Sequence, residues 1–306
     1  MRVAIIGAGA MGGILGYYLS AEADLVLVDG WAEHVAAINT DGLRCEIDGV
    51  EHIRLVYAVT DPADAGYTDV VIILVKAHQN PWAIRVAQSL LGPGALAYTL
   101  QNGVGNREVL AASLGDSRVG QGVTSLGGTL LGPGRVRHAG LGPTVFGSVP
   151  HRPVAEALAD LFRRCGLPAD VRDDTDALLW GKLLVNVGIN ALTALLRVPN
   201  GALADLPQVH DLLAQAVNEA AAVATARGVH VPYADPVAHV LDVARATAAN
   251  RSSMLQDVLR GGITEIASIN GAIVREGTRL GVPTPINTIL LSLIESLDAS
   301  VDRRVV

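Results

Sequence analysis

The sequence predicts an α/β chain with two domains, in which a doubly wound parallel sheet is followed by an all-helical C-terminal domain. Short β-branched runs alternate with helical segments through the first half. Val70–Val75 is apolar at every position, as in a central strand buried on both faces of a parallel sheet. From Asp174 onward Ala and Leu dominate, and prolines separate long helical patterns. These three observations together set the fold class.

The elements of the first half follow in chain order. The expected strands are Arg2–Ile6, Leu25–Val28, Val70–Val75 and Ala95–Leu100, and the expected helices are Met11–Ser20 and Gln79–Leu91. Two segments depart from this alternation. Gly42–Val59 predicts a short antiparallel pair that turns at Asp48-Gly49, and Thr129–Ser148 predicts a second hairpin.

Length and composition support this organisation. The chain has 306 residues, of which 50% are hydrophobic and 17% charged, against about 25% charged in an average domain. With a mean hydropathy of +0.37 it can bury a large core, which excludes disorder. We expect a sheet domain over residues 1–172 and a helical domain over residues 173–306.

Charge and cysteine content limit the partners and the compartment. The net charge is −7, and a nucleic-acid partner would require a basic face. Cys45 and Cys165 cannot form a disulfide framework and are expected to be reduced thiols. Val3–Ala21 is uncharged, but five glycines interrupt it, so we do not expect a signal peptide. We expect a cytoplasmic protein that binds neither nucleic acid nor membrane.

Two further apolar stretches occur in the sequence. No stretch predicts a transmembrane helix, because the uncharged run from Val86 to Asn106 is split by Gly92-Pro93-Gly94. Ile286–Leu297 is interpreted as either core or the face of a homodimer.

A glycine-rich turn gives the first chemical signal. The segment fits G-x-G-x-x-G, follows a predicted strand and opens a predicted helix. The first glycine permits a tight turn, the second lets the backbone approach a pyrophosphate, and the third allows close helix–strand packing. The helix N-terminus then attracts the phosphates. The alternative is a packing turn without a ligand. We expect a Rossmann-type dinucleotide site at Gly7, Ala8, Gly9, Ala10, Met11 and Gly12.

Asp29 ends the second predicted strand, about twenty residues after the glycines, where an acidic side chain accepts hydrogen bonds from the ribose hydroxyls of NAD. The alternative is an ordinary turn residue beside Gly30. Residues 28–34 contain no Arg or Lys that could hold a 2′-phosphate, and Glu33 adds negative charge. We therefore expect NADH to be used at least as well as NADPH.

A polar stripe in the second half indicates chemistry. Lys182, Asn186 and Asn190 are spaced i, i+4 and i+8 in a predicted helix, so they lie along one face among apolar neighbours. Burying an amine and two amides costs several kcal/mol unless each is satisfied. The alternative is a solvated polar face.

Together with further motifs, these features resemble the ketopantoate reductase (2-dehydropantoate 2-reductase) family nearly end to end. The matching segments are Gly7–Gly12, Val75-Lys76-Ala77 with Gln79, Gln101-Asn102-Gly103, Lys182 with Asn186 and Asn190, Pro199-Asn200-Gly201, Ser252–Asp257 and Thr264-Glu265-Ile266. The resemblance implies a Rossmann domain, a helical domain and an active site in the cleft between them. It also implies reduction of ketopantoate to D-pantoate, in pantothenate and coenzyme A biosynthesis, with NADPH as the usual cofactor.

The resemblance further implies residue roles. Lys182 matches the catalytic lysine, and Glu265 matches the acidic residue near the cofactor and that lysine. Substrate contacts are implied for Asn102, Asn186, Asn190, Asn200 and Ser253. Cofactor contacts are implied for Lys76, Gln79, Asn102, Gly127 and Glu265, beside Asp29 and the glycine-rich turn. Ile263 and Ala267 depart from the family pattern, which often has a basic residue and an Asp there.

Hydride transfer to a ketone leaves negative charge on the oxygen, and Lys182 can supply a proton there as general acid. A lysine near its usual pKa is protonated at pH 7. The sequence has no zinc-like cluster of Cys and His, so we expect no metal. One alternative is a reductase of another small 2-oxo or 3-oxo acid. A second is a non-catalytic dinucleotide sensor, against which the intact Lys182, Asn186, Asn190 and Glu265 argue.

Overall fold

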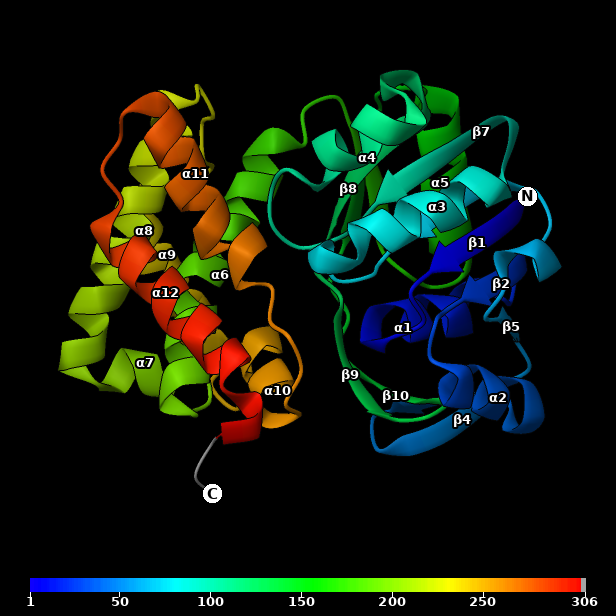
Figure 1. Cartoon of the computed structure of the whole chain (residues 1–306), viewed down its shortest axis with the longest axis horizontal. Coiled ribbons are helices and arrows are strands. Elements are labelled where there is room, and N and C mark those ends of the chain that lie inside the picture. The colour runs from blue at the N-terminus through cyan, green and yellow to red at the C-terminus, as the bar shows by residue number, and fades with distance from the viewer. Residues whose placement is uncertain (304–306) are drawn as a thin grey trace. The chain divides into compact units, whose positions relative to one another are not determined.

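The computed structural model of the chain describes residues 1–303, which divide into two compact units (Figure 1). The first unit comprises Met1–Gln101 and Asn106–Thr175. The second comprises Asn102–Gly105 and the residues from Asp176 onward. Residues 102–105 therefore belong with the helices, although they lie far from them in the sequence.

The first unit is built on a sheet that, within the described residues, has eight strands in the order β12-β11-β8-β7-β6-β1-β2-β5. The pairs are parallel except for β8 with β11. This arrangement confirms the predicted doubly wound α/β class. The strands are β1 (Arg2–Ile6), β2 (Asp24–Val28), β5 (Tyr57–Val59), β6 (Thr68–Ile73), β7 (Leu91–Thr99), β8 (Val119–Thr124), β11 (Thr144–Gly147) and β12 (Ala169–Arg172).

Strand β7 differs from its predicted start. The Gly92-Pro93-Gly94 segment was expected to separate a helix from a strand beginning at Ala95, but β7 begins at Leu91. Leu91 pairs with Thr68, and the register with β6 shifts before Val70. This irregularity lets the strand accommodate Gly and Pro, which otherwise weaken a ladder.

Both faces of the large sheet are covered by helices. Along β1, Val3 and Ile5 enter one core, whereas Ala4 and Ile6 enter another, as the two-residue period of a strand requires. Residues of α1 (Ala10–Leu19), α2 (Ala32–Asp41) and α5 (Arg152–Arg164) line the first core, and residues of α3 (Asn80–Leu90) and α4 (Asn106–Leu114) line the second. Short 3-10 turns are η1 (Pro62–Asp64), η2 (Ala77–Gln79) and η3 (Asp116–Arg118).

Both predicted hairpins form. They are β3 (Leu43–Ile47) with β4 (Val50–Arg54), and β9 (Gly127–Gly132) with β10 (Arg135–Gly140). Asp48 and Gly49 have φ of 50° and 79°, as a tight hairpin turn requires. The sequence did not predict that β3 and β10 pair in parallel, which joins the hairpins into one four-stranded sheet.

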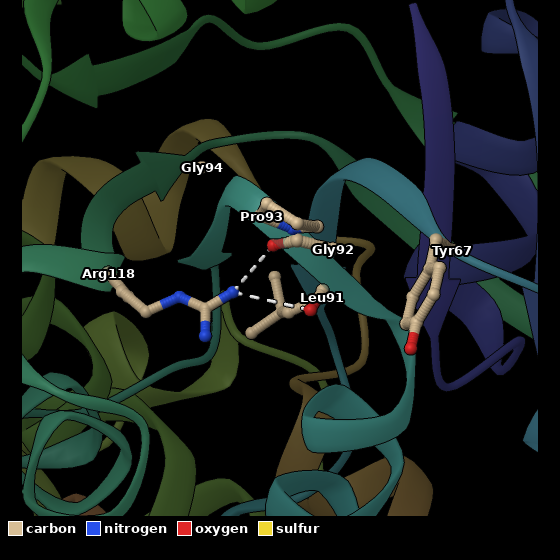
Figure 2. Close-up of a pocket in the computed structure, with 6 residues that line it drawn as sticks. All are labelled: Tyr67, Leu91, Gly92, Pro93, Gly94 and Arg118. Carbon is tan, nitrogen blue, oxygen red and sulfur yellow. Dashed lines mark hydrogen bonds between the residues drawn. The ribbon is translucent and has the colours of Figure 1, made fainter.

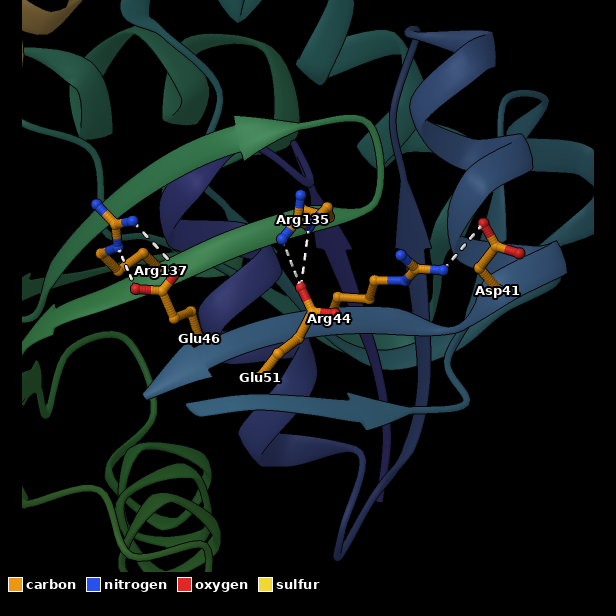
Figure 3. Close-up of polar contacts among 6 residues, drawn as sticks. All are labelled: Asp41, Arg44, Glu46, Glu51, Arg135 and Arg137. Carbon is orange, nitrogen blue, oxygen red and sulfur yellow. Dashed lines mark hydrogen bonds and ion pairs between the residues drawn. The ribbon is translucent and has the colours of Figure 1, made fainter. Parts of the chain in front are cut away.

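Ion pairs cross the surface of this small sheet (Figure 3). Arg137 Nε lies 2.7 Å from Glu46 Oε1, and Arg135 Nη2 lies 2.7 Å from Glu51 Oε1. Arg44 pairs with Asp41 of α2 at 3.4 Å. Because these pairs are solvent-exposed, each contributes little to stability.

The second unit is helical, as predicted. It contains α6 (Asp176–Leu196), α7 (Ala202–Asp205), α8 (Pro207–Ala226), α9 (Pro236–Ala246), α10 (Ser253–Leu259), α11 (Asn270–Leu280) and α12 (Pro285–Ala299), with η4 (Ile266–Ser268) and η5 (Val301–Arg303). α6 packs against α8, α9, α10 and α12. By length and composition α6 could cross a membrane, but 72% of its most apolar window is buried, as in the core helix of a soluble protein.

Helix α12 carries most of the apolar run that was interpreted as core or dimer face. Leu290 and Ile294 are buried in the core of the second unit, whereas Ile289 and Leu293 are 55% and 48% exposed. The run therefore supplies core on one side and leaves apolar side chains on the other. A homodimer stays a prediction.

Candidate active site

The glycine-rich turn connects β1 to α1 as predicted, and its glycines have distinct geometric reasons. Gly7 has a φ of +96°, and a Cβ there would lie 2.8 Å from Val75 Cγ1. A Cβ on Gly12 would lie 1.8 Å from the Gly7 carbonyl oxygen, so only glycine fits. A Cβ on Gly9 would meet nothing within 4 Å, which leaves open space beside the turn.

These residues fit a dinucleotide. Gly9 is the N-cap of α1 and offers no side chain to the first amides of the helix. A helix N-terminus carries partial positive charge, so it favours a phosphate.

The turn also contacts β9, because a Cβ on Gly128 would lie 3.4 Å from the Ala10 carbonyl oxygen. Gly127, a predicted cofactor contact, is the first residue of that strand.

Asp29 follows β2 and is tied to the glycine-rich turn. Its Oδ2 accepts a hydrogen bond from the Ala8 amide at 2.7 Å, and its Oδ1 accepts one from the Trp31 amide at 2.9 Å. The carboxylate therefore lies beside the glycine-rich turn and stabilises the local backbone. Contact with a ribose stays a prediction.

Lys76 and Gln79 lie at the carboxyl end of β6, around η2. Gln79 Oε1 accepts a hydrogen bond from the Lys76 amide at 3.3 Å. Gln101 stabilises this segment through two hydrogen bonds. Its Nε2 donates to the Val75 carbonyl at 2.8 Å and to Asn80 Oδ1 at 2.7 Å. Asn80, which is only 4% exposed, was not predicted from the sequence; its amide directly after Gln79 was the available signal.

The second unit brings together three predicted site residues from separate parts of the sequence. Lys182 Nζ, on α6, donates to Asn102 Oδ1 at 2.8 Å. Asn102 Nδ2 donates to Glu265 Oε2 at 3.2 Å. Gly103 lets this segment approach η4, since a Cβ there would lie 2.1 Å from the Ser268 carbonyl oxygen. The amide of Asn102 thus links the amine and the carboxylate.

Burial lowers the pKa of Lys182 to about 8, although the nearby charge of Glu265 acts to raise it. The expectation of an ordinary pKa for Lys182 was wrong, because loss of hydration disfavours the ammonium. A pKa near the operating pH suits a group that both holds and releases a proton.

Three buried amides of the second unit, Asn190, Asn200 and Asn270, have a side-chain atom with no hydrogen-bond partner among the described residues. Asn190 is 4% exposed, and its Nδ2 has no hydrogen-bond partner. Asn200 donates from Nδ2 to Thr247 Oγ1 at 2.9 Å, while its Oδ1 has no partner. An unsatisfied buried polar group costs about 1–3 kcal/mol. Asn186 lies one helical turn before Asn190 and is partly buried.

Ser253 is the first residue of α10 and is exposed, whereas Ser252 is buried. Ser252 Oγ accepts from the Leu255 amide at 3.1 Å and lies 2.7 Å from Thr193 Oγ1 of α6. Ser252 and Thr193 thus join the N-cap of α10 to α6 by a side-chain hydrogen bond, and neither residue was predicted as a site residue. α10 ends at Leu259, before Gly261 with its φ of 68°, so Glu265 is on a separate element.

One depression in the first unit lies apart from all predicted site residues (Figure 2). It has a volume of about 520 Å³ and is lined by Tyr67, Leu91, Gly92, Pro93, Gly94 and Arg118. Arg118 Nη2 donates to the Gly92 carbonyl at 2.9 Å and to the Leu91 carbonyl at 3.3 Å. Its guanidinium thus secures the start of β7. In residues 1–303 no group of three or more His, Cys, Asp or Glu is arranged to hold a metal.

The parallel sheet, the glycine-rich turn and the helical second unit with its partly buried lysine define a nicotinamide dinucleotide-dependent oxidoreductase. Comparison with known proteins gives the family. Residues 3–151 match "Ketopantoate reductase PanE/ApbA", and residues 174–298 match "Ketopantoate reductase PanE/ApbA C terminal". The chain belongs to the ketopantoate reductase family.

Curated relatives agree over almost the whole chain. A 2-dehydropantoate 2-reductase of Halobacterium salinarum is 37% identical over 300 residues, which covers 96% of this chain and 98% of the relative. One from Archaeoglobus fulgidus is 35% identical, covering 97% of this chain and 98% of the relative.

Solved structures agree as well. A PanE/ApbA family ketopantoate reductase from Ralstonia eutropha is similar with a TM-score of 0.91 and 34% identity, covering 99% of this chain and 100% of the other. A D-mandelate dehydrogenase, solved with NADH and anilino(oxo)acetate, is similar with a TM-score of 0.92 and 30% identity over the same shares.

Proposed function

We propose that this protein reduces ketopantoate to D-pantoate with NADH or NADPH, and that Lys182 is the general acid. The observation that carries the proposal is the hydrogen-bonded chain from Lys182 through Asn102 to Glu265. The names of the curated relatives support the substrate. A cytoplasmic location belongs to the same proposal.

Lys182 acts on the oxygen of the substrate carbonyl. A nicotinamide dinucleotide, when bound, supplies a hydride to the carbonyl carbon. The oxygen gains negative charge, and Lys182 Nζ donates a proton to it. Asn102 holds Nζ through its Oδ1, which fixes the direction of the remaining N–H groups. Glu265 keeps the lysine protonated at neutral pH because its negative charge raises the pKa of Lys182.

The amides and one hydroxyl are assigned to the substrate. Asn190 Nδ2 and Asn200 Oδ1 are buried without partners, and a donor and an acceptor suit a hydroxylated oxo acid. Asn186 lies between Lys182 and Asn190 on α6, and Ser253 is exposed at the start of α10. Asn102, which accepts a hydrogen bond from Lys182, also contacts the substrate.

The first unit binds the dinucleotide. The amides at the start of α1 receive the pyrophosphate, and Asp29 accepts a hydrogen bond from the ribose 2′-hydroxyl. Lys76, Gln79 and Gly127 of this unit make further contacts. Because Asp29 and Glu33 are acidic and no Arg or Lys lies within residues 28–34, we propose that NADH is used at least as well as NADPH.

A second candidate is reduction of a different 2-oxo acid by the same lysine chemistry. The similarity to D-mandelate dehydrogenase favours it, since that enzyme matches this chain over its full length. The ligand in that structure, anilino(oxo)acetate, differs from ketopantoate in the group attached to the 2-oxo acid.

Initial-rate assays decide between the candidates. Oxidation of NADH and of NADPH is followed with ketopantoate, with an aryl 2-oxo acid and with a 3-oxo acid, and Lys182→Ala serves as the control for contaminating activity. The highest kcat/KM is expected with ketopantoate. A preference for the aryl acid would support the second candidate, and binding of dinucleotide without turnover of any oxo acid would refute both.

A further inference from the structure

His34 is a buried histidine on α2 with a fixed proton position. Its Nδ1 accepts a hydrogen bond from the Gly134 amide at 3.0 Å. The ring proton must therefore be on Nε2, which donates to the Ala8 carbonyl at 3.0 Å. Burial lowers the pKa of His34, with the charge of Asp29 opposing, which is consistent with a neutral ring.

The peptide on either side of Ala8 is consequently held by two side chains. Asp29 Oδ2 accepts its N–H at 2.7 Å, and His34 binds its carbonyl. Ala8 lies between the first two glycines of the glycine-rich turn. The indole of Trp31 stacks on the His34 ring with centroids 5.1 Å apart and an interplanar angle of 10°, which restrains the ring further.

We propose that His34 is a positioning residue for the dinucleotide, because it fixes the Ala8 carbonyl and thereby the direction of the amides that receive the pyrophosphate. This inference rests on the proposed function. A turn that is ordered before binding loses less conformational entropy when the ligand binds, so its affinity is higher. The same ring also secures the β9–β10 turn through Gly134, so one side chain couples two loops.

A purely structural role is the competing explanation, and α2 offers a matched control. Asn39, five residues after His34 on the same helix, also makes two hydrogen bonds to distant backbone. Its Nδ2 donates to the Ala58 carbonyl at 2.8 Å, and its Oδ1 accepts from the Ala58 amide at 3.0 Å. Ala58 is in β5 and not in the glycine-rich turn. Asn39→Ala thus removes comparable bonds without touching Ala8.

The experiment measures NADH affinity by fluorescence titration, with kcat and Tm for each variant. His34→Ala and His34→Phe should raise the Kd for NADH about tenfold, the effect expected for a lost hydrogen bond. Their kcat at saturating NADH should stay within about threefold of wild type, because His34 does not touch the reacting atoms. His34→Gln retains a donor and an acceptor, so it should recover much of the affinity. Asn39→Ala should lower Tm and leave the Kd unchanged.

Each contrary outcome is informative. An unchanged Kd in His34→Ala and His34→Phe, or an equal rise in Asn39→Ala, would overturn the inference and leave the proposed function intact. If His34→Ala does not fold, the Kd values for NADH of His34→Phe and His34→Gln test the inference. His34→Phe keeps the ring stack and His34→Gln keeps the hydrogen bonds, so a higher Kd in His34→Phe than in His34→Gln supports it and equal values overturn it. A wild-type protein that binds neither NADH nor NADPH would refute the proposed function, and the inference with it.

Discussion

Lys182 Nζ lies 2.8 Å from Asn102 Oδ1, although the two residues are 80 positions apart in the chain. The contact lies within the second unit, because residues 102–105 pack with the helices. Asn102 in turn donates to Glu265, so the charged groups are linked by a neutral amide.

Lys182→Ala should retain the fold and dinucleotide binding while lowering kcat/KM by about 10²–10⁴-fold, the usual range for a lost general acid. The matched control is Lys182→Arg, which keeps the positive charge but does not release a proton near neutral pH. Steady-state kinetics with ketopantoate and an NADH titration measure the two effects separately. Activity within about threefold of wild type in Lys182→Ala would reject the assigned role.

The pH dependence follows from the pKa of Lys182, about 8. A general acid must be protonated, so kcat/KM for reduction should fall as the pH rises through about 8. Because Glu265 raises that pKa, Glu265→Gln should move the descending limb to lower pH. A pH–rate profile between about pH 6 and 10 measures the descending limb in the wild type and in Glu265→Gln. A limb that does not move in Glu265→Gln would contradict the electrostatic link.

Asn186→Ala and Ser253→Ala should each weaken substrate binding by about 1–2 kcal/mol, because each would remove one of the proposed hydrogen bonds to the oxo acid. Ser252→Ala is the contrast: Ser252 caps α10, so its loss should lower Tm rather than raise KM. KM values and melting curves for the three variants separate the roles. If KM is unchanged in both Asn186→Ala and Ser253→Ala, the substrate binds elsewhere.

NADH should be used at least as well as NADPH. A 2′-phosphate carries nearly two negative charges and would face Asp29 and Glu33 without an Arg or Lys in residues 28–34. The double variant Asp29→Ser/Glu33→Arg should shift the preference toward NADPH, and Glu33→Arg alone is the control that leaves the Asp29–Ala8 hydrogen bond in place. Kinetics with both cofactors decide. A wild-type kcat/KM that favours NADPH by about tenfold would rule the preference out.

Much of the fold could be predicted because its signals are local. The apolar run at Val70–Val75 and the glycine-rich turn specify buried strands and a strand–helix turn through periodicity and backbone freedom alone. The Asp48-Gly49 turn was likewise visible, since few residues adopt two successive positive φ values. Each of these features depends on residues that are neighbours in the sequence.

Other features were decided only by tertiary structure. The parallel pairing of β3 with β10 joins segments nearly a hundred residues apart, and no local pattern specifies such a partner. A single histidine on a helix gives no sign that it will bridge Ala8 and Gly134. The lowered pKa of Lys182 is also invisible in the sequence, because it depends on desolvation by residues brought together by folding. The sequence by itself determined the fold class and the family, and it named candidates for the chemistry. The packed structure decided which atoms these residues meet and how strongly Lys182 holds a proton.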